Sequence, residues 1–396
     1  MIYIYFALAA LLVFFSYRSL RSGIDFLKYF KQELAKPPSG YIPFTTVIAP
    51  CKGTDESLAA NIGAVLAQDH PCYEVVFVVE SSDDLAVPVI RSAIRTTAVP
   101  TKLIIAQKSA ESGQKVENLR EAVLHAEPRS EVFVFVDSDV RPANDWVRQI
   151  VGPLEDERIG AASGYRWFVG ERSTFATELR SAWNASIASV QGGNTASNFC
   201  WGGSMAVRRS VFEKLDIREN WRGTLSDDLV VTRLIKAAGM PICFVPKAIV
   251  ASTGTCTLRG LLEFTNRQIK ITRVYAQNLW LLSFFSAGLF NLVMIVSALM
   301  LLLLRPGTLR WSLSIATIAA VAVLSTGKAW LRAKSIRLAL PEQQEFLDRQ
   351  LIYQLTLWLF TPALFFVNCI AALFSRRITW RGTDYEMISP VETRVL

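Results

Sequence analysis

Histidine and closely paired cysteines are scarce in this sequence. The 396 residues include two histidines, and the six cysteines, at positions 51, 72, 200, 243, 256 and 369, show no C-x-x-C spacing. Structural zinc sites need such clusters of histidine and cysteine, so no zinc site of the usual ligand types is predicted. The spacing instead indicates free thiols in a reducing compartment.

Three motifs of common enzyme classes are also missing. The chain has no GxxxxGK[ST] phosphate loop, no GxGxxG after its first predicted strand, and no GxSxG with triad partners. The net charge of +8 does not indicate a nucleic-acid partner, because much of it flanks apolar segments, where it suits membrane topology and anionic headgroups. Examples of these flanking residues are Lys328, Arg332, Lys334 and Arg337.

Charge is absent from the first seventeen residues, MIYIYFALAALLVFFSY, and 51% of the whole chain is hydrophobic. Three further apolar runs, at 279–304, 309–324 and 351–374, are each near the roughly 20 residues that cross a bilayer. No basic region precedes the first run, no small-residue cleavage site follows it, and basic residues from Arg18 onward come next. We therefore predict a multi-pass membrane protein with an uncleaved N-terminal anchor and its soluble domain in the cytoplasm.

This pattern predicts three domains: an anchor over 1–20, a cytoplasmic domain over 21–275, and a membrane region with a short basic tail over 276–396. Three full crossings in the last region would leave the tail Ser375-Arg376-Arg377 outside, against the positive-inside preference. One of the three runs can therefore be re-entrant or interfacial. Pro362 points to the last run, while the run at 309–324 is the weakest as a span.

Strand and helix patterns alternate in the first part of the soluble region. Strands are predicted at 45–50, 74–80, 101–106 and 131–137, with helices at 57–68, 86–97 and 116–126 between them. This alternation predicts an α/β fold with a mostly parallel sheet and helices on both faces. Ligands of such sheets bind beyond the carboxyl ends of the strands.

Acidic residues gather where two of these strands end. The stretch ESSDD supplies Glu80, Asp83 and Asp84, and FVFVDSDVRP supplies Asp137 and Asp139. Clustered carboxylates need hydrogen-bond donors or a hard cation, and a nucleoside and a metal-bound diphosphate provide both. The pattern therefore predicts a nucleotide-diphosphate site. The alternative is that Asp-Ser-Asp is a solvated turn whose Asp139 or Asn144 caps a helix that starts near Pro142.

A second acidic pair opens a predicted helix at 226–239, SDDLVVTRLIKAAG. Ser226 is the expected N-cap and Gly239 the expected stop, which places Asp227 and Asp228 in the first turn. These two charges either answer the helix dipole or belong to the acidic site, and the sequence leaves both open.

The segment 173–190 carries an apolar stripe at near-helical spacing. Such a stripe fits either a membrane-facing helix that admits a lipid or a plain core-facing helix. After it, CWGG at 200–203 fits a strand and turn in which the glycines let an acceptor approach the backbone. The residues of the stripe are Phe175, Leu179, Trp183, Ile187 and Val190.

In combination these motifs resemble the inverting nucleotide-sugar glycosyltransferases of GT-A fold, in the glycosyltransferase family 2 superfamily. The specific likeness is to the ceramide glucosyltransferase-like branch, with its D, D, D, (Q/R)xxRW pattern. It runs from about residue 41 to residue 275, and the tail ITWRGTDY at 378–385 shares it. The matching stretches are APCKG (49–53), ESSDD (80–84), VDSDVRP (136–142), CWGGSMAVRRSVF (200–212), SDDLV (226–230) and NRQIKITRVY (266–275).

The resemblance implies a role for each matching residue. Asp139 would bind a divalent metal, Mg²⁺ or Mn²⁺, and Asp228 would be the catalytic base, with Asp227 beside it. Arg267 and Lys270 would lie by the diphosphate, and Glu80 and Asp137 would contact the nucleoside. The full set expected to bind the donor is Pro50, Lys52, Glu80, Asp83, Asp84, Asp137, Trp201 and Gly202.

Two positions depart from the family pattern. The first acid is Glu80 in the simplest register, where the family has Asp, although Asp83 or Asp84 are alternatives. The RxxRW signature begins at Arg267 but has Lys270 and then isoleucine, so a point charge replaces a forked guanidinium. A register shifted to Lys270-Ile-Thr-Arg273-Val274 keeps the arginine.

The resemblance implies a membrane enzyme that moves a hexose, with glucose as the first choice, from a UDP-sugar to a lipid hydroxyl. Ceramide is the first expected acceptor by likeness alone, and hopanoid, diacylglycerol and polyprenyl phosphate are competitors. A catalytically inactive membrane scaffold is the alternative from another class, motivated by the altered signature. An enzyme should lose activity with EDTA, whereas a scaffold should show no metal-dependent loss of UDP-sugar.

Overall fold

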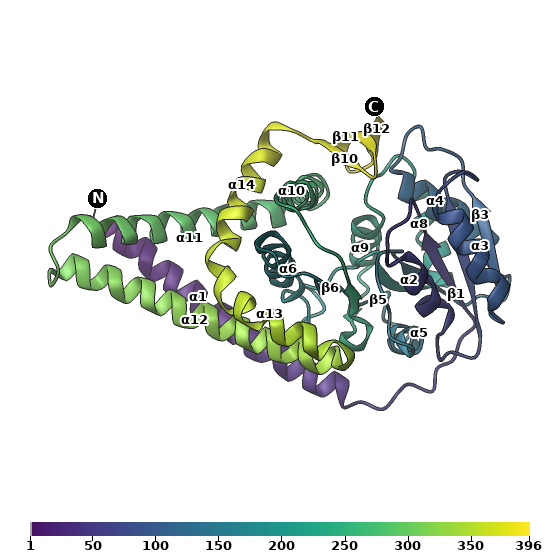
Figure 1. Cartoon of the computed structure of the whole chain (residues 1–396), viewed down its shortest axis with the longest axis horizontal. Coiled ribbons are helices and arrows are strands. Elements are labelled where there is room, and N and C mark those ends of the chain that lie inside the picture. The colour runs from purple at the N-terminus through teal and green to yellow at the C-terminus, as the bar shows by residue number, and fades with distance from the viewer. Residues whose placement is uncertain (1) are drawn as a thin grey trace. The chain divides into compact units, whose positions relative to one another are not determined.

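The computed structural model describes residues 2–396 (Figure 1). The chain forms two compact units, each assembled from separate stretches of sequence. We call them the helical unit, which comprises the chain up to Lys31 with Arg172–Ser189 and Thr255–Ser375, and the sheet unit, which comprises Gln32–Glu171, Val190–Gly254 and Arg376–Leu396. The domain boundaries expected at residues 20 and 275 stay predictions.

The sheet unit is built on a seven-stranded sheet with the strand order β3-β2-β1-β4-β7-β5-β8. The strands β3, β2, β1 and β4 are parallel, β7 is antiparallel to both of its neighbours, and β5 pairs in parallel with β8. The α/β fold with a mostly parallel sheet is thus confirmed. The strands are β1 (Thr45–Pro50), β2 (Tyr73–Val79), β3 (Thr101–Ile105), β4 (Val132–Val136), β5 (Ala161–Ser163), β7 (Ser204–Arg208) and β8 (Ile242–Phe244).

Every residue of β1, β2 and β4 is buried. Strands covered by helices on both faces need continuous apolar sequence, which is why TTVIAP, YEVVFVV and VFVFV do not alternate with polar residues. Helices from the intervening segments and from the later part of the unit pack on this sheet. They are α2 (Leu58–Leu66), α3 (Ala86–Thr96), α4 (Gln114–Ala122), α5 (Trp146–Val151), α7 (Arg209–Lys214), α8 (Ile217–Asn220) and α9 (Asp227–Ala237), with single turns η1 (Val123–His125), η2 (Gly152–Glu155) and η3 (Pro246–Ala248).

Two small sheets complete the sheet unit. The strands β6 (Arg166–Phe168) and β9 (Val250–Ser252) pair in parallel. The C-terminal strands β10 (Arg377–Trp380), β11 (Thr383–Ser389) and β12 (Glu392–Val395) form an antiparallel sheet, which we call the tail sheet.

Some predicted element ends match the structure and one does not. The helix after Asp139 begins at Trp146, later than the start expected near Pro142, and Asp145 holds its N-cap position, so neither Asp139 nor Asn144 caps it. Ser226 precedes α9 as expected, although its hydroxyl bonds Asp228 rather than a backbone amide. Residues 202–203 form a turn directly before β7. All six cysteines are free.

The helical unit contains the long apolar helices α1 (Ile2–Leu34), α11 (Gln277–Leu303) and α12 (Leu309–Ala339), which run alongside one another (Figure 1). Each is long and apolar enough to cross a membrane. Their contact is a cluster that includes Tyr5, Leu12, Val293 and Val321, and the Tyr5 hydroxyl forms a buried 2.6 Å hydrogen bond with Ser297. These helices indicate membrane association.

The last apolar run is broken. The segments Pro341–Leu359 and Thr361–Phe374 meet at 59°, as a broken span or a re-entrant loop would, and the break at Phe360 lies two residues before Pro362. This is the run that the sequence singled out. Its elements are η4 (Pro341–Gln343), α13 (Gln344–Thr356), η5 (Leu357–Leu359) and α14 (Thr361–Phe374).

The apolar stripe lies on α6 (Phe175–Ala188), which packs against α10 (Leu258–Tyr275), α13 and α14. Leu179 and Trp183 are buried there, and the Trp183 ring stacks on Phe365 with centroids 4.7 Å apart. These two residues therefore face the helical unit's own core. Phe175 remains 51% exposed, and Val190 lies beyond the end of the helix.

Candidate functional site

The two carboxylates that follow β4 are met by two cations that the sequence analysis did not single out. Lys115, in the first turn of α4, places its Nζ 2.8 Å from Asp137 Oδ1. Arg166, on β6, lies 3.0 Å from Asp137 Oδ2 and 3.4 Å from Asp139 Oδ2. The Arg166 guanidinium also lies over the Trp201 ring, 4.7 Å from its centroid, which fixes the plane of the guanidinium.

These contacts keep the site ionised. Burial alone would raise the pKa of Asp137, but the charges of Lys115 and Arg166 outweigh it and lower that pKa below its usual value. Burial opposes the charge on Lys115, yet Asp137, and after it Asp227, raise the lysine pKa well above its ordinary range. Lys115 and Asp137 are therefore a part-buried ion pair at neutral pH.

Lys115 also connects the β4 carboxylates to the acidic pair of α9. Its Nζ lies 3.3 Å from Asp227 Oδ1, and its third partner is the Gly202 carbonyl at 3.4 Å. Burial raises the pKa of Asp227 to about 7, with Asp228 adding to the effect and Lys115 opposing it. Asp227 and Asp137 therefore contact the same lysine, and the catalytic role of the α9 acids stays a prediction.

Asp228 is held in a different way from its neighbour. Its Oδ1 accepts hydrogen bonds from the Ser226 hydroxyl at 2.6 Å and from the Leu229 amide at 2.8 Å. Its Oδ2 accepts only a longer bond, 3.3 Å, from the Gly202 amide. Asp228 is half-buried while Asp227 is buried, so Asp228 is the more accessible carboxylate of the pair.

The close packing around these carboxylates requires glycine at positions 202 and 203. A Cβ at Gly202 would lie 2.1 Å from Asp227 Oδ2, and a Cβ at Gly203 would lie 2.2 Å from the Trp201 ring. Any side chain would displace one of these groups. The turn at 202–203 therefore brings backbone directly against the carboxylates.

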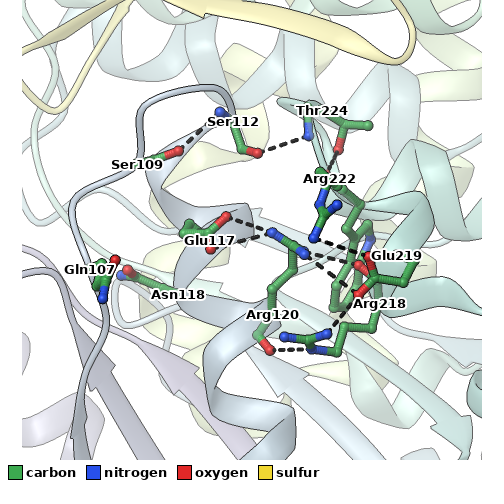
Figure 2. Close-up of polar contacts among 12 residues, drawn as sticks. Gln107, Ser109, Ser112, Glu117, Asn118, Arg120, Arg218, Glu219, Arg222 and Thr224 are labelled. Carbon is green, nitrogen blue, oxygen red and sulfur yellow. Dashed lines mark hydrogen bonds and ion pairs between the residues drawn. The ribbon is translucent and has the colours of Figure 1, made fainter.

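A polar network ties α4, which presents Lys115, to the segment that leads into α9 (Figure 2). Arg120 pairs with Glu117 at 3.0 Å and with Glu219 at 3.6 Å. Arg120 Nε donates to the Arg218 carbonyl at 3.1 Å, and Arg218 Nε donates to the Arg120 carbonyl at 3.0 Å. Because Arg120 is buried, these bonds fix the spacing between α4 and α8 and hence between Lys115 and the α9 acids.

The acids that follow β2 also lie beyond the carboxyl end of a strand, but they contact other residues than Asp137 and Asp139 do. Lys52 lies two residues after Pro50, the last residue of β1, and its Nζ is 2.9 Å from Glu80 Oε2. Asp84 Oδ1 accepts from the Gly53 amide at 2.9 Å and joins the two loops. Asp83 is exposed. Glu80 and Asp84 thus lie at the edge of the sheet where Asp137 also lies.

The residues of the altered RxxRW signature lie on α10, in the helical unit. The Arg267 guanidinium is 5.7 Å from the centroid of the Phe264 ring, and Ile271 is buried. Arg273, the arginine of the shifted register, donates to the carbonyls of Ala372 and Leu373 at the end of α14. The diphosphate roles of Arg267 and Lys270 stay predictions.

The carboxylates after β4 and at α9 suit a divalent cation. Asp139 Oδ1 and Asp227 Oδ2 are buried and accept no hydrogen bond from any residue in the range 2–396. The four carboxylates of Asp137, Asp139, Asp227 and Asp228 outnumber the two cations, Lys115 and Arg166. Within that range no group of three or more His, Cys, Asp or Glu side chains is placed to hold a metal, so an ion here would need substrate oxygens as well, as Mg²⁺ commonly does.

Lys115 and Arg166 are the residues that sequence reasoning missed. A signal for Lys115 existed, because a helix that follows a parallel strand begins at the carboxyl edge of the sheet, where the acids were already expected. Arg166 is the first residue of β6, which has three residues and follows another strand of three residues, β5. Strands this short show no periodic sequence pattern.

A sequence model of the family described as Glycosyl transferase family 21 matches residues 6–390. The mannosyltransferase PcManGT from Pyrobaculum calidifontis, solved in complex with GDP-Man and Mn²⁺, superposes with a TM-score of 0.52 at 18% identity, over 88% of this chain and 99% of that chain. At this identity the likeness concerns the fold alone.

A second solved structure, GalNAc-T7 with UDP, GalNAc and Mn²⁺, gives a TM-score of 0.41 at 14% identity. It covers 54% of this chain and 44% of that chain.

Proposed function

Because the chain belongs to glycosyl transferase family 21, whose members transfer sugar from nucleotide sugars, we propose that it moves a hexose, first glucose, from a UDP-sugar to a lipid hydroxyl. One observation carries this proposal beyond the family. Lys115 lies between Asp137 at the end of β4 and Asp227 at the start of α9, so the acids expected for donor binding and for catalysis share one site.

Asp228 is proposed as the general base. Its Oδ1 is held by Ser226 and Leu229, which leaves Oδ2, with its single longer bond, as the oxygen that takes a proton from the acceptor hydroxyl. A positioned base of this kind contributes about 100-fold to 10,000-fold in rate. Direct attack on the anomeric carbon inverts it and needs no covalent intermediate.

The neighbouring residues are proposed to organise the donor. Lys115 and Arg166 keep Asp137 ionised and oriented, so that it accepts hydrogen bonds from the nucleoside, and Glu80 does the same beside Lys52. Asp139, with its unpartnered Oδ1, would hold a divalent ion, Mg²⁺ or Mn²⁺, which when bound neutralises charge on the leaving diphosphate. Arg267 and Lys270 are proposed to add positive charge there.

The lipid acceptor is proposed from the membrane character of the chain. Three helices are long and apolar enough to cross a bilayer, which would hold the catalytic domain at the cytoplasmic surface, where a lipid hydroxyl is the nearest acceptor. Ceramide is the first choice, and hopanoid, diacylglycerol and polyprenyl phosphate are the competitors.

Transfer of labelled sugar into extractable lipid tests the proposal. Membranes with the protein receive UDP-glucose, UDP-galactose or UDP-N-acetylglucosamine together with ceramide, hopanoid or diacylglycerol. Label should enter one lipid, and it should be absent with EDTA and with Asp228→Asn, while UDP binding by that variant is retained. A folded protein that binds no UDP-sugar and labels no lipid would refute the proposal and favour the scaffold.

A further inference from the structure

The tail sheet presents an unusual turn. Trp380 pairs with Thr383 across a two-residue loop, and both loop residues, Arg381 and Gly382, have positive φ, +49° and +79°. Two-residue hairpin loops with this backbone favour Asn-Gly, because asparagine and glycine tolerate positive φ better than other residues do. A bulky arginine at that position is not what the hairpin itself would select, which points to a use for the side chain.

Two hydrogen bonds hold this hairpin against the candidate site. Lys52, the partner of Glu80, donates to the Thr383 hydroxyl at 3.4 Å. The buried Tyr385 hydroxyl accepts a hydrogen bond from the Gln114 backbone N–H at 3.2 Å. Gln114 directly precedes Lys115 in the first turn of α4. The hairpin is thus bonded both to the loop after β1 and to the helix that presents Lys115.

Arg381 itself is exposed, and its side chain makes no ion pair or hydrogen bond with any residue in the range 2–396. The positive charge of Arg381 nevertheless affects the pKa of Asp137. Burial works to raise the pKa of Asp137, Lys115 and Arg166 lower it, and Arg381 adds to the lowering. The guanidinium therefore lies near enough to Asp137 to interact with it through space, yet all five of its donors are available.

We propose that Arg381 binds the diphosphate of the nucleotide-sugar donor and that the tail sheet is thereby part of the donor site. The inference rests on the proposed function. A guanidinium matches two phosphate oxygens with a bidentate pair of hydrogen bonds, and its charge would stabilise the negative charge that grows on the leaving nucleotide. The strained hairpin holds this side chain at a fixed place relative to Lys52 and Gln114.

An anionic lipid headgroup is the other source of phosphate near a membrane enzyme. The two bonds that anchor the hairpin lead to residues of the candidate donor site, so the observations favour the donor. The experiment therefore compares soluble nucleotide with lipid vesicles.

The test uses the full chain in detergent and three variants. Arg381→Asn removes the charge and places the favoured Asn-Gly in the turn, so it should leave the melting temperature unchanged or raise it. Arg381→Lys keeps the positive charge but lacks the planar guanidinium that can bind two phosphate oxygens at once. Arg394→Gln is the matched control, because Arg394 is an exposed arginine on β12 of the same sheet.

Calorimetric titration with UDP and with uridine separates the diphosphate from the nucleoside. Arg381→Asn should weaken UDP binding about 10-fold or more, change uridine binding by less than about 2-fold, and raise the KM for the donor. Arg381→Lys should fall between it and the wild type, and Arg394→Gln should match the wild type.

Three results would overturn the inference. The first is UDP binding by Arg381→Asn equal to that of an active wild type. The second is an equal loss for UDP and uridine, or a lowered melting temperature, which would mean a structural role. The third is a loss of binding to vesicles with anionic lipid while UDP binding is kept. A wild type that neither binds UDP nor transfers sugar would instead refute the proposed function.

Discussion

Replacing Lys115 with methionine would remove the charge that joins the two acidic pairs while keeping much of the side chain. Its Nζ lies 2.8 Å from Asp137 and 3.3 Å from Asp227. At an effective dielectric constant of about 20, unit charges at such distances attract by about 6 and 5 kcal/mol, and the desolvation of two part-buried charges and one buried charge offsets most of this. Removing one partner of a buried pair typically costs about 3–5 kcal/mol. We therefore expect Lys115→Met to lower the free energy of unfolding of the sheet unit by about 3 kcal/mol.

The loss should depend on pH in a defined direction. In the wild type, Lys115 and Arg166 overcome burial and lower the folded pKa of Asp137. Asp137 thus contributes stability above its unfolded pKa, near 3.9, and that contribution disappears as the pH falls through the folded pKa. In the variant, burial is less opposed and the folded pKa of Asp137 rises. Asp227 acts in the same direction, because Lys115 also lowers its pKa, which burial raises to about 7 in the wild type. The stability difference between the two proteins should therefore be largest above about pH 8 and shrink toward about pH 5.

Thermal unfolding in detergent, followed by tryptophan fluorescence, measures this effect. A loss of about 3 kcal/mol corresponds to about 6–12 °C for a unit of roughly 150–250 residues. Lys214→Met is the control, since Lys214 is exposed on α7. The reasoning is refuted if Lys115→Met, like the control, has the melting temperature of the wild type. It is also refuted if the stability losses of Lys115→Met and Asp227→Asn simply add in the double variant, with a coupling energy below about 0.5 kcal/mol.

Three further predictions concern the same unit. Gly202→Ala should strongly reduce sugar transfer, because its Cβ would lie 2.1 Å from Asp227 Oδ2, and full activity in the transfer assay would contradict this close approach. Arg120→Met should lower the free energy of unfolding by about 2 kcal/mol through the loss of charged hydrogen bonds, and a denaturant midpoint equal to that of the wild type would show that the network contributes little. EDTA should abolish transfer, added Mn²⁺ or Mg²⁺ should restore it, and Asp139→Asn should fail to respond to limiting metal in that titration.

Each of these has a control. Gly63→Ala changes a helical glycine whose added Cβ would meet nothing within 4 Å, so it should leave transfer unchanged. Arg158→Met removes an exposed arginine whose ion-pair partner among residues 2–396 is the nearby Asp156, and it should hardly change stability. Asp139→Asn should keep the melting temperature of the wild type, which separates a lost metal ligand from a misfolded protein.

Local sequence patterns predicted the sheet well, and the reason is physical. The run VFVFV ends where Asp137 begins, and a buried strand that stops at a charge places that charge at the edge of the sheet. The same logic located Glu80 after β2 and the acids of α9 after Ser226. Periodicity over 5 to 12 residues is set by local burial, so it can be seen in one segment alone.

The contacts that complete the site were not predictable in this way. Lys115 joins Asp137 to Asp227, and these three residues come from separate segments that only tertiary packing brings together. Tyr385 meets Gln114 across 271 positions in sequence. The sequence could place Lys115 at the edge of the sheet, but the identity of a distant partner is not encoded in any one segment. The contacts of Lys115 with both acids, and of the tail sheet with α4, are therefore seen only in the three-dimensional structure.

The discontinuous sheet unit has a consequence for biosynthesis. The tail sheet belongs to the sheet unit, yet its residues follow every apolar helix in the chain. Since a chain is made and begins to fold from its N-terminus, the sheet unit can gain this last layer only after the membrane segments have left the ribosome. Until then the Gln114 amide lacks its hydroxyl partner and Lys52 lacks Thr383. Completion of the site would thus wait for membrane insertion, and a chain that stalls within its apolar helices would stay unfinished where the donor is expected to bind.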